Sequence, residues 1–380
     1  MITRIEARQY RCLQSVRQEL GQFHVLVGPN GSGKSAFLDT FAFMGTFLSD
    51  GLIEAVRDRT ENFHDLVWGR EAGCFELAVE ALGPKMGAGW RMPLRYELTV
   101  AIHAPSDAIV VTKERVTSHP NEQGARVVVE RNRESVRISP EAPGEPESLS
   151  GLGDGRSALV YIDRSRFPSS FWLRELLSSG LQTVALENAS LRKPSAPAKG
   201  DLKVIDGSTL ARLVFQLQTD SKDRFGRWIE HVQTALPDLD SIRTVLRPED
   251  KHRYLMLRYK NGIEAPSWVV SDGTLRLLAL TILAYLPNFK GIYLVEEPEN
   301  GVHPTALETI YQSLSSVYDG QVLVTSHSPI LLNLPKLEEL LCFQKNPEGT
   351  EIIRGDAHPA LREWKREISL SDLFASGVLG

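Results

Sequence analysis

The sequence predicts an α/β protein in which a mainly parallel sheet carries an antiparallel β subdomain and a helical insertion. The apolar run Phe23–Val27 is followed by a glycine-rich turn and then a segment of helical composition. From Ser271 onward strands alternate with helices, which is typical of a parallel sheet. Between these regions, Cys74 to Arg137 consists of short alternating segments separated by turn residues, which favours antiparallel pairing.

These patterns divide the chain into four consecutive parts. Residues 1–72 hold the first part of the parallel-sheet core, and we expect its N-terminal strands to come from the first 40 residues. Residues 73–157 form the antiparallel subdomain and end in an exposed acidic loop rich in Pro and Gly. Residues 158–262 read as a helical lobe with a Pro-rich loop near Lys193 to Lys199, and 263–380 return to the core.

The order of elements is clearest in residues 263–380. The sequence pattern there predicts a helix at 273–285, a strand at 291–295, a helix at 305–318 and a strand at 321–325. No sustained heptad pattern is present in the helical lobe, so we expect a compact molecule without long coiled-coil arms.

Composition and charge describe an ordinary globular chain. Its 380 residues are 42% hydrophobic and 24% charged, and the net charge of −5 shows no basic excess of the kind that advertises a nucleic-acid-binding domain. The longest apolar run, Leu277–Leu286, is about half of the ~20 residues that a membrane-spanning helix needs. Three distant cysteines and an N-terminal segment without an apolar stretch predict a cytoplasmic protein with no membrane segment.

The strongest motif is a glycine-rich loop between a buried strand and a helix. Gly28-Pro-Asn-Gly-Ser-Gly33-Lys34-Ser35 matches G-x-x-x-x-G-K-[ST] at every defined position. In such a loop backbone amides and the helix N-terminus face phosphates, the lysine neutralises the β and γ oxygens, and the hydroxyl ligates magnesium. The residues expected to bind the nucleotide are Asn30, Gly31, Ser32, Gly33, Lys34, Ser35 and Ala36.

Two further strands end in groups that can do chemistry. Glu296 and Glu297 end the first of these strands, and His327 follows the second. Because ligands bind at the carboxyl ends of parallel strands, we expect these side chains beside the phosphate loop. Successive side chains of a strand point to opposite sides, so Glu296 is expected to face a metal and Glu297 an attacking water.

A fourth motif opens a helix that is apolar on nearly every face. It reads Ser271-Asp272-Gly273, and because the helix is buried only its N-terminus can serve a polar role. Taken alone, this is a helix cap provided by Ser271 or Asp272.

Together and in this order, the four motifs resemble the ABC-type P-loop ATPases. The sequence looks most like their SMC/RecF-like soluble branch, in particular the stand-alone ATPases related to the ATPase part of overcoming-lysogenization-defect proteins. The runs that carry the resemblance are Ile5-Glu-Ala-Arg-Gln-Tyr10-Arg11-Cys-Leu, Glu296-Glu297-Pro-Glu299-Asn300-Gly-Val-His303-Pro304 and Thr325-Ser-His327-Ser-Pro. The first 40 residues and 270–335 match closely, and the middle only by position.

The resemblance implies a role for each matching residue and implies ATP and Mg²⁺ as ligands. Ser35 and Glu296 would hold the metal, Glu297 would be the general base and His327 the γ-phosphate switch. Lys34 would act on the phosphates, with Arg11 near the nucleotide. Ser271 and Gly273 would act in trans on ATP held by a second copy, so the site is complete only in a homodimer. Asn300 and His303 fall where this family has its inter-subunit loop.

Three positions depart from the family pattern. Glu296 stands where an aspartate is usual, and Asp272 stands where the signature usually has glycine, which puts a negative charge near the expected γ-phosphate. The family's Q-loop glutamine should lie near Asn62 to Gly69, and no residue there is convincing.

Two functions remain open at this stage. The first is an ATPase whose ATP-driven dimerisation switches a process on DNA or RNA, in DNA maintenance or antiviral defence; the link to nucleic acid comes from the resemblance. The second is a nucleotide-switched scaffold or sensor with little turnover that regulates a partner effector. A transporter ATPase subunit is disfavoured by the run after Val295 and by the large insertion.

A nuclease activity of the chain itself is not expected. In the overcoming-lysogenization-defect family a nuclease domain with clustered acids follows the ATPase, whereas residues 328–380 are few and their acids are scattered. We therefore expect a nuclease-like effector on a separate polypeptide. Basic residues gather at 126–137 and 247–260, but interspersed acids favour a solvated face there. Trp228 and Trp268 are expected in the core.

Overall fold

The fold is taken from a computed structural model of the chain. The structure describes residues 1–86, 90–103, 106–119, 124–133, 135–141, 144–197, 204–347, 349–362 and 369–376. The end of the expected Pro-rich loop, at 198–199, lies outside these residues.

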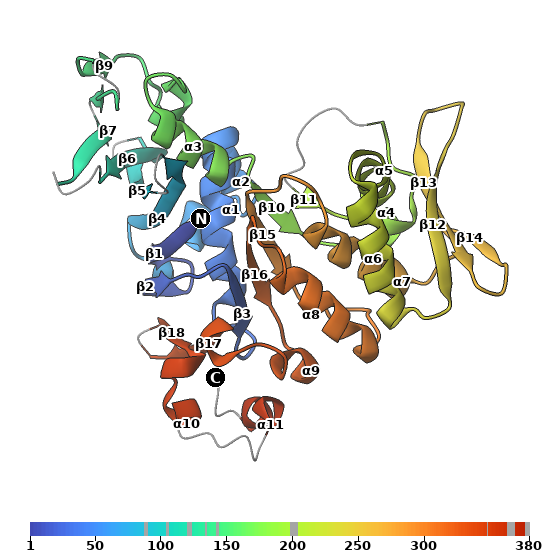
Figure 1. The fold of residues 1–380 in the computed structure, drawn as a ribbon. Helices are drawn as coiled ribbons and strands as arrows, with labels where there is room; N and C mark the ends of the chain where they lie inside the picture. The colour runs from blue at the N-terminus through green and yellow to red at the C-terminus, as the bar shows by residue number, and fades with distance from the viewer. Residues whose placement is uncertain are drawn as a thin grey trace.

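A seven-stranded sheet runs through the middle of the molecule (Figure 1). Neighbouring strands are parallel except for the last pair, which is antiparallel. Its order is β11 (Val204–Ile205), β10 (Leu181–Val184), β15 (Ile292–Glu296), β16 (Gln321–Thr325), β3 (Phe23–Val27), β17 (Leu340–Asn346) and β18 (Gly349–Arg354). This confirms the predicted mainly parallel sheet, and β16 has the predicted bounds.

Both faces of this sheet are covered, which explains why its central strands are apolar throughout. All five residues of β3 are buried. Leu26 belongs to one hydrophobic cluster, whereas Val25 and Val27 belong to a second cluster on the opposite face. The first cluster includes helix α1 (Lys34–Ser49), and the second includes α7 (Asp272–Thr281) and α8 (Leu307–Ser315). Parallel strands buried on both faces are expected to be apolar without alternation.

The predicted antiparallel subdomain forms an eight-stranded sheet, and β1 and β2 belong to it. Its order is β2 (Leu13–Glu19), β1 (Ile2–Tyr10), β4 (Cys74–Met86), β5 (Trp90–His103), β6 (Ala108–Ser118), β7 (Arg126–Asn132), β8 (Val136–Ile138) and β9 (Glu147–Leu149). Of the strands in the first 40 residues, only β3 therefore joins the parallel sheet. The reason is the alternation of buried and exposed residues in β1 and β2, which suits a sheet with one solvated face. β9 also lies inside the segment expected as a loop.

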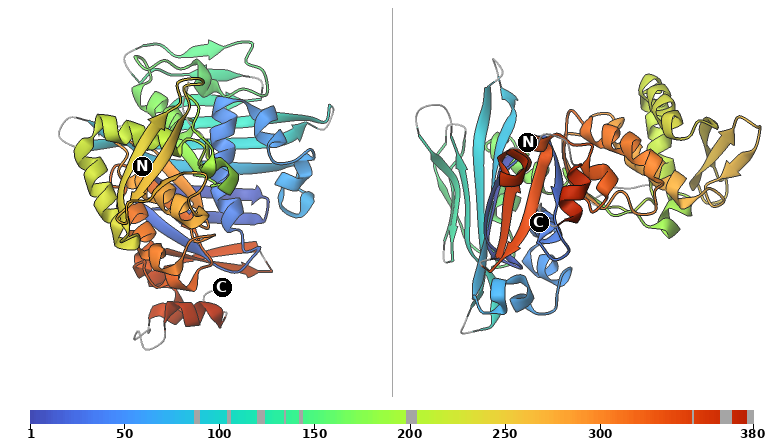
Figure 2. Two further views of the ribbon diagram at one scale, coloured as in Figure 1. Left: turned by 90° about the vertical axis from the view of Figure 1, so that its right-hand side faces the viewer. Right: turned by 90° about the horizontal axis from the view of Figure 1, so that it is seen from below.

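The segment 158–262 is less helical than predicted. Its helices are α3 (Pro168–Leu177), α4 (Asn188–Arg192), α5 (Leu210–Asp220) and α6 (Lys222–Ala235). Strands β10 and β11 lie between them and extend the parallel sheet from β15. A three-stranded antiparallel sheet follows, made of β12 (Leu239–Leu246), β13 (Arg253–Tyr259) and β14 (Glu264–Pro266). Figure 2 shows this small sheet and the eight-stranded sheet at opposite ends of the molecule.

The remaining elements are short. They are the helices α2 (Leu52–Arg57), α9 (Pro329–Leu332), α10 (Pro359–Arg362) and α11 (Leu370–Ala375), and the 3₁₀ turns η1 (Phe63–Leu66), η2 (Trp68–Arg70), η4 (Ala158–Tyr161), η5 (Ile282–Ala284), η6 (Pro304–Ala306), η7 (Leu337–Glu339) and η8 (Gly355–Ala357). Among the described helices, none has the length and hydropathy needed to cross a bilayer.

The two predicted core tryptophans differ. Trp228 is fully buried, and its indole N–H donates to the Thr281 hydroxyl over 2.9 Å. Trp268 is 45% exposed, so the prediction of a core position is wrong; its ring packs beside that of Tyr254, with 4.9 Å between the ring centroids. Trp268 lies just after β14, the edge strand of the small sheet.

Candidate nucleotide site

The phosphate loop connects β3 to α1, and two of its glycines are required by close packing. Gly28 has φ 151°, and a Cβ there would lie 2.4 Å from the backbone oxygen of Phe343. Gly33 has φ 105°, and a Cβ there would lie 2.6 Å from the Thr350 hydroxyl. The turn thus takes its shape against β17 and β18, and α1 begins directly after it at Lys34.

Lys34 folds back over the loop that precedes it. Its Nζ donates to the backbone oxygens of Gly28 and Pro29 over 2.7 and 2.9 Å. Burial lowers the pKa of this ammonium to about 8, and the nearby Glu297 carboxylate opposes the shift. The lysine is therefore a poorly solvated cation, and an anion in the loop would favour its charged form.

The two glutamates at the end of β15 face different partners. Glu296 Oε2 accepts a 3.2 Å hydrogen bond from the Ser35 hydroxyl, so the extra methylene relative to aspartate does not prevent contact with the loop. Glu297 has a left-handed backbone (φ 45°), and its N–H donates to the Thr325 carbonyl over 3.0 Å. Its Oε2 accepts from the Asn300 amide over 2.7 Å, and its Oε1 lies 3.6 Å from His327 Nε2.

Glu299 holds the loop that carries His327, and our sequence analysis assigned it no role. One oxygen of its carboxylate accepts three hydrogen bonds of 2.7 to 3.0 Å, from the Ser326 hydroxyl and the backbone N–H groups of His327 and Ser328. The signal was present in the sequence, because Glu299 lies two residues beyond Glu297 in the run that carried the resemblance.

Arg11 reaches the site from the end of β1. Its backbone is left-handed (φ 52°), and its Nη1 donates to Asp39 Oδ2 over 2.8 Å. Asp39 also accepts from the Tyr10 hydroxyl and from Arg59 Nε, each over 2.7 Å. Asp39 and Arg59 were missed by sequence reasoning, although Asp39 lies one helical turn beyond Ser35 on α1.

Several of these groups line an open cavity of about 670 Å³. Among the described residues it is lined by Arg11, Cys12, Asn30, Gly31, Gly33, Lys34, Ser35, Ala36, Asp65, Val67, Gly69, Arg70, Glu297, Thr325 and His327. Nine of the predicted site residues are in this set. Two others lie just outside it, because Ser32 is buried beneath the loop and Glu296 contacts Ser35 from the strand end.

The segment Asn62 to Gly69 does reach this cavity, but not with a glutamine. It contributes Asp65, Val67 and Gly69, and Arg70 follows directly.

The predicted signature lies elsewhere in the chain. Ser271 caps α7, with its hydroxyl accepting from the Thr274 N–H over 3.2 Å. A Cβ on Gly273 would lie 2.9 Å from the Gly301 carbonyl, so the signature packs against the loop that follows Glu297. Neither Ser271 nor Gly273 is among the described residues that line the cavity of their own chain.

The unusual Asp272 has a cationic partner. Its Oδ1 lies 2.7 to 2.8 Å from two nitrogens of Arg192 on α4, and the same guanidinium donates to the Trp268 carbonyl over 2.8 Å. The negative charge at the start of α7 is thereby balanced locally.

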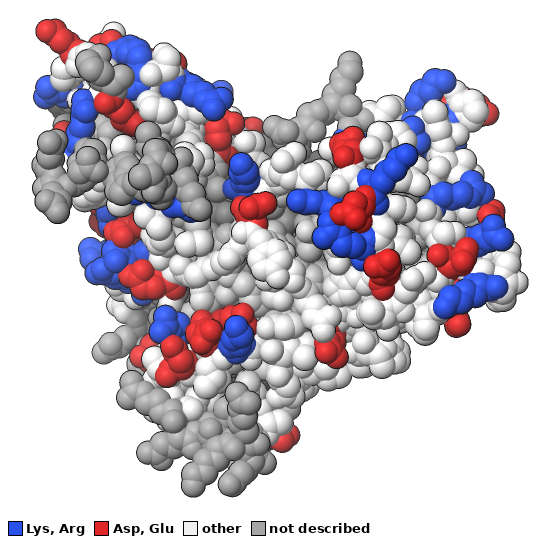
Figure 3. Space-filling view, in the orientation of Figure 1, with Lys and Arg blue, Asp and Glu red and all other residues white. Residues whose placement is uncertain are grey.

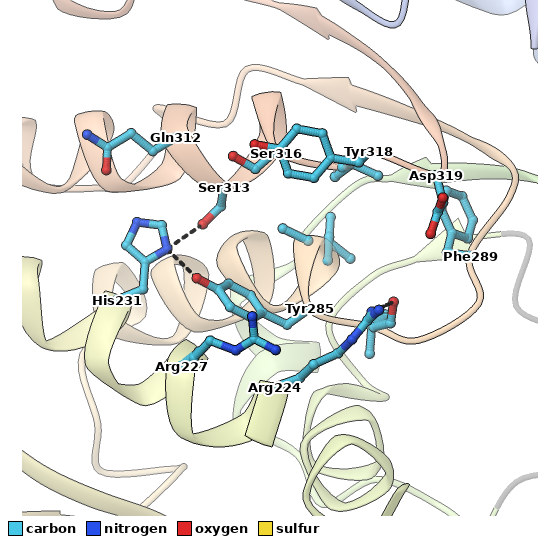
Figure 4. A pocket seen from close by; sticks show the side chains of 14 residues that line it. Arg224, Arg227, His231, Tyr285, Phe289, Gln312, Ser313, Ser316, Tyr318 and Asp319 are labelled. Carbon is cyan, nitrogen blue, oxygen red and sulfur yellow. Dashed lines mark hydrogen bonds between the residues drawn. The ribbon is translucent and has the colours of Figure 1, made fainter. Parts of the chain in front are cut away.

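A second hollow, shown in Figure 4, contains none of the sequence motifs. It has a volume of about 280 Å³ and lies between α6 and α8, with Arg224 and Arg227 on one wall. His231 Nδ1 lies 2.9 Å from the Tyr285 hydroxyl and 3.3 Å from that of Ser313, and burial lowers the pKa of this histidine.

Part of the chain matches a known protein family. Residues 158–333 match the family described as "AAA domain, putative AbiEii toxin, Type IV TA system", a stretch that includes the acidic strand and His327. Over 373 residues the chain is 19% identical to the OLD nuclease of Thermus scotoductus. The alignment covers 93% of this chain and 64% of the relative, so the chain spans just under two thirds of that protein's length.

Solved structures share the fold. The head of SMC bound to the C-terminal winged-helix domain of ScpA has a TM-score of 0.55 at 15% identity, covering 93% of this chain and 97% of that chain. An SMC head with an extended coiled coil, bound to the C-terminal domain of ScpA derived from Pyrococcus furiosus, has a TM-score of 0.51 at 12% identity, covering 93% and 95%.

The fold is therefore that of the SMC heads, a P-loop NTPase fold. In sequence and fold the chain is thus similar to SMC/RecF-like P-loop ATPases and to the OLD proteins.

Proposed function

We propose that this chain is a cytoplasmic ATPase that closes into a homodimer around Mg²⁺-ATP and couples hydrolysis to DNA maintenance or antiviral defence through a separate effector protein. The observation that carries the ATPase proposal is the convergence of Lys34, Glu297 and His327 on one cavity. The names of the relatives, an OLD nuclease and SMC heads, support a process that acts on DNA.

The residues present suit magnesium held mainly by its substrate. The Ser35 hydroxyl and the Glu296 carboxylate lie together, and both are hard oxygen ligands. The described part of the chain has no cluster of three or more His, Cys, Asp or Glu side chains that could hold a metal alone. Magnesium usually takes one or two protein ligands, with phosphates and water completing its shell. When bound, it would neutralise charge on the phosphate oxygens.

The hydrolytic roles follow from the contacts of Glu297. Asn300 fixes one carboxylate oxygen and leaves the other facing His327 and the cavity. From there Glu297 can accept a proton from a water attacking the γ-phosphate, while His327 and Lys34 donate hydrogen bonds to the phosphate oxygens. Because Ser271 and Gly273 do not reach this cavity, a second copy is proposed to present its α7 N-terminus to the phosphates.

Glu297→Gln tests both hydrolysis and dimerisation. The amide cannot act as a base, so turnover should fall by about 10² to 10⁴-fold while ATP binding remains. In light scattering with Mg²⁺-ATP, the trapped protein should shift from 42.3 kDa to twice that mass. Glu54→Gln on α2 is a matched exposed control, and Lys34→Ala should lose both binding and the shift. A protein that binds ATP and stays monomeric would contradict the homodimer.

The alternative is a nucleotide-switched scaffold or sensor with little turnover. The observation that favours it is Asp272, because a carboxylate stands on the face proposed to meet the partner's γ-phosphate. Turnover of the wild-type protein, alone and with DNA or RNA, separates the two functions. ATP-dependent dimerisation without measurable phosphate release in any condition would support the sensor.

The basic groups in the described part of the chain give no independent support for a nucleic-acid site. On the face in Figure 3, Lys and Arg are interspersed with Asp and Glu. Arg131, one of the residues in the basic group at 126–137, is buried beside Glu114. In the second group, Arg247 and Arg258 lie near Asp250 and Asp240. Nucleic acid therefore stays a proposed partner, reached directly or through the effector.

A further inference from the structure

The turn formed by η1 and η2 brings a cation into the nucleotide cavity that no motif predicted. The turn is attached to the end of β1: the Arg11 N–H donates to the Leu66 carbonyl over 2.9 Å, and Tyr10 forms a β-bridge with Val67. Arg70 closes the turn and lines the cavity. Its position is thus tied to the same strand end that carries Arg11.

The backbone at Arg70 has an uncommon conformation. Gly69 and Arg70 both have left-handed conformations, with φ 67° and φ 61°. Such values are uncommon for a residue with a Cβ and tend to be retained at ligand-binding sites. The Arg70 side chain is 75% exposed, whereas that of Arg11 is 37% exposed.

Among the described residues, the Arg70 side chain has one ion-pair partner, and the pair is exposed. Its Nη2 lies 2.8 Å from Asp65 Oδ1. Asp65 is itself fixed from behind, because its Oδ2 accepts from the Thr60 hydroxyl over 2.8 Å. An ion pair this exposed contributes little, whereas a guanidinium binds phosphate through two parallel hydrogen bonds. A phosphate in the cavity can therefore compete with Asp65 for Arg70.

We propose that Arg70 binds the phosphates of ATP and that Asp65 holds it aside until the nucleotide arrives. This rests on the proposed function of the cavity as an ATP site. The other strongly basic groups that line the described cavity are engaged more firmly: Lys34 donates to two backbone oxygens, and Arg11 shares Asp39 with Arg59. The described lining holds no Phe, Tyr or Trp side chain on which the base could stack. Arg70 and Asp65 thus take the place where the family's Q-loop glutamine was expected.

Calorimetric titration of Mg²⁺-ATP, Mg²⁺-ADP and AMP into the full chain tests this, in a Glu297→Gln background that prevents hydrolysis. Arg70→Ala loses a charge-assisted contact, so this variant should bind ATP about 10- to 100-fold more weakly. Its affinity for ADP should fall less, and its affinity for AMP should change little. Arg57→Ala is the matched control: that arginine lies on α2, is 72% exposed and is 3.8 Å from Glu54. It should leave all three affinities unchanged.

Asp65→Asn separates ligand binding from a structural role. If Asp65 only holds Arg70 away from the phosphates, Asp65→Asn should bind ATP as tightly as the Glu297→Gln parent or several-fold more tightly. Arg70→Ala should bind ATP more weakly. Equal weakening by both variants would mean that the ion pair shapes the turn, and would overturn the proposal. An equal loss for ATP, ADP and AMP would place Arg70 on the nucleoside and also overturn it. Lys34→Ala distinguishes failure of this proposal from failure of the proposed function. Unchanged ATP affinity in Lys34→Ala would show that the cavity is not the ATP site.

Discussion

Lys34 shows at the scale of one residue how burial adjusts the chemistry of the phosphate loop. Its ammonium donates to two backbone oxygens and is largely removed from water, so its pKa falls to about 8. The Glu297 carboxylate opposes this shift without cancelling it. The charge that phosphate binding needs is therefore partly lost from the free protein just above neutral pH.

ATP affinity should consequently decline as the pH rises. Below pH 8 Lys34 is mostly protonated in the free protein, so binding requires no proton uptake. Above its pKa the bound state holds the extra proton, and the affinity should fall up to roughly tenfold per pH unit. Titration of the wild-type protein with a non-hydrolysable ATP analogue at pH 7.5, 8.5 and 9.5 measures this, because Glu297 stays in place. Lys34→Arg keeps its charge and should give a flat profile; a flat profile in the parent would argue against the lowered pKa.

At the scale of an element, the loop after β15 connects three parts of the site. Asn300 fixes the Glu297 carboxylate, Glu299 fixes the backbone of His327, and Gly301 contacts the start of α7 at Gly273. His303 ends the loop, where its Nδ1 accepts from the Thr305 N–H at the start of η6. The position of His327 therefore depends on a carboxylate two residues beyond the proposed base.

Glu299→Ala should lower the kcat of ATP hydrolysis with little change in KM. Three hydrogen bonds to the loop that carries His327 are lost, and a misplaced catalytic group can cost roughly 10- to 100-fold in rate. Glu299→Gln retains an oxygen acceptor and should recover part of the rate. Glu308→Ala, an exposed change on α8, should have no effect. Steady-state phosphate release gives both constants, and a rise in KM alone would contradict a positioning role.

At the scale of the whole molecule, one buried glutamine joins the two large sheets. Gln321, the first residue of β16, donates through Nε2 to the carbonyls of Ile2 and Gly21 over 2.8 and 2.6 Å. Its Oε1 accepts from the Ile2 N–H over 3.1 Å. Ile2 starts β1, so this side chain links the antiparallel sheet to the parallel sheet. The two linked residues are 319 positions apart in the chain.

Gln321→Ala should destabilise the chain by about 2 to 4 kcal/mol, because it leaves backbone groups buried without partners. Urea unfolding followed by tryptophan fluorescence measures the change. Gln312→Ala, on the exposed face of α8, is the matched control and should stay within about 0.5 kcal/mol. Equal stability of the two variants would show that water or a rearrangement replaces the bonds of Gln321.

The sequence by itself determined the parallel sheet, the phosphate loop, the two glutamates at the end of β15 and His327. These depend on short-range rules: apolar runs form buried strands, and glycines permit a loop that packs against a neighbour. It also indicated the antiparallel subdomain through alternation. Only the tertiary structure decided that β1 and β2 join that subdomain and that β10 extends the parallel sheet.

Tertiary structure alone also paired Asp272 with Arg192, Asp39 with Arg11 and Arg59, and brought the Arg70 turn into the cavity. These residues are polar and have no periodicity that marks them. Their partners lie up to 80 positions away, as in the pair of Arg192 with Asp272. Which charges meet is set by how the sheets and helices pack, since burial of apolar faces contributes far more to folding than exposed ion pairs do.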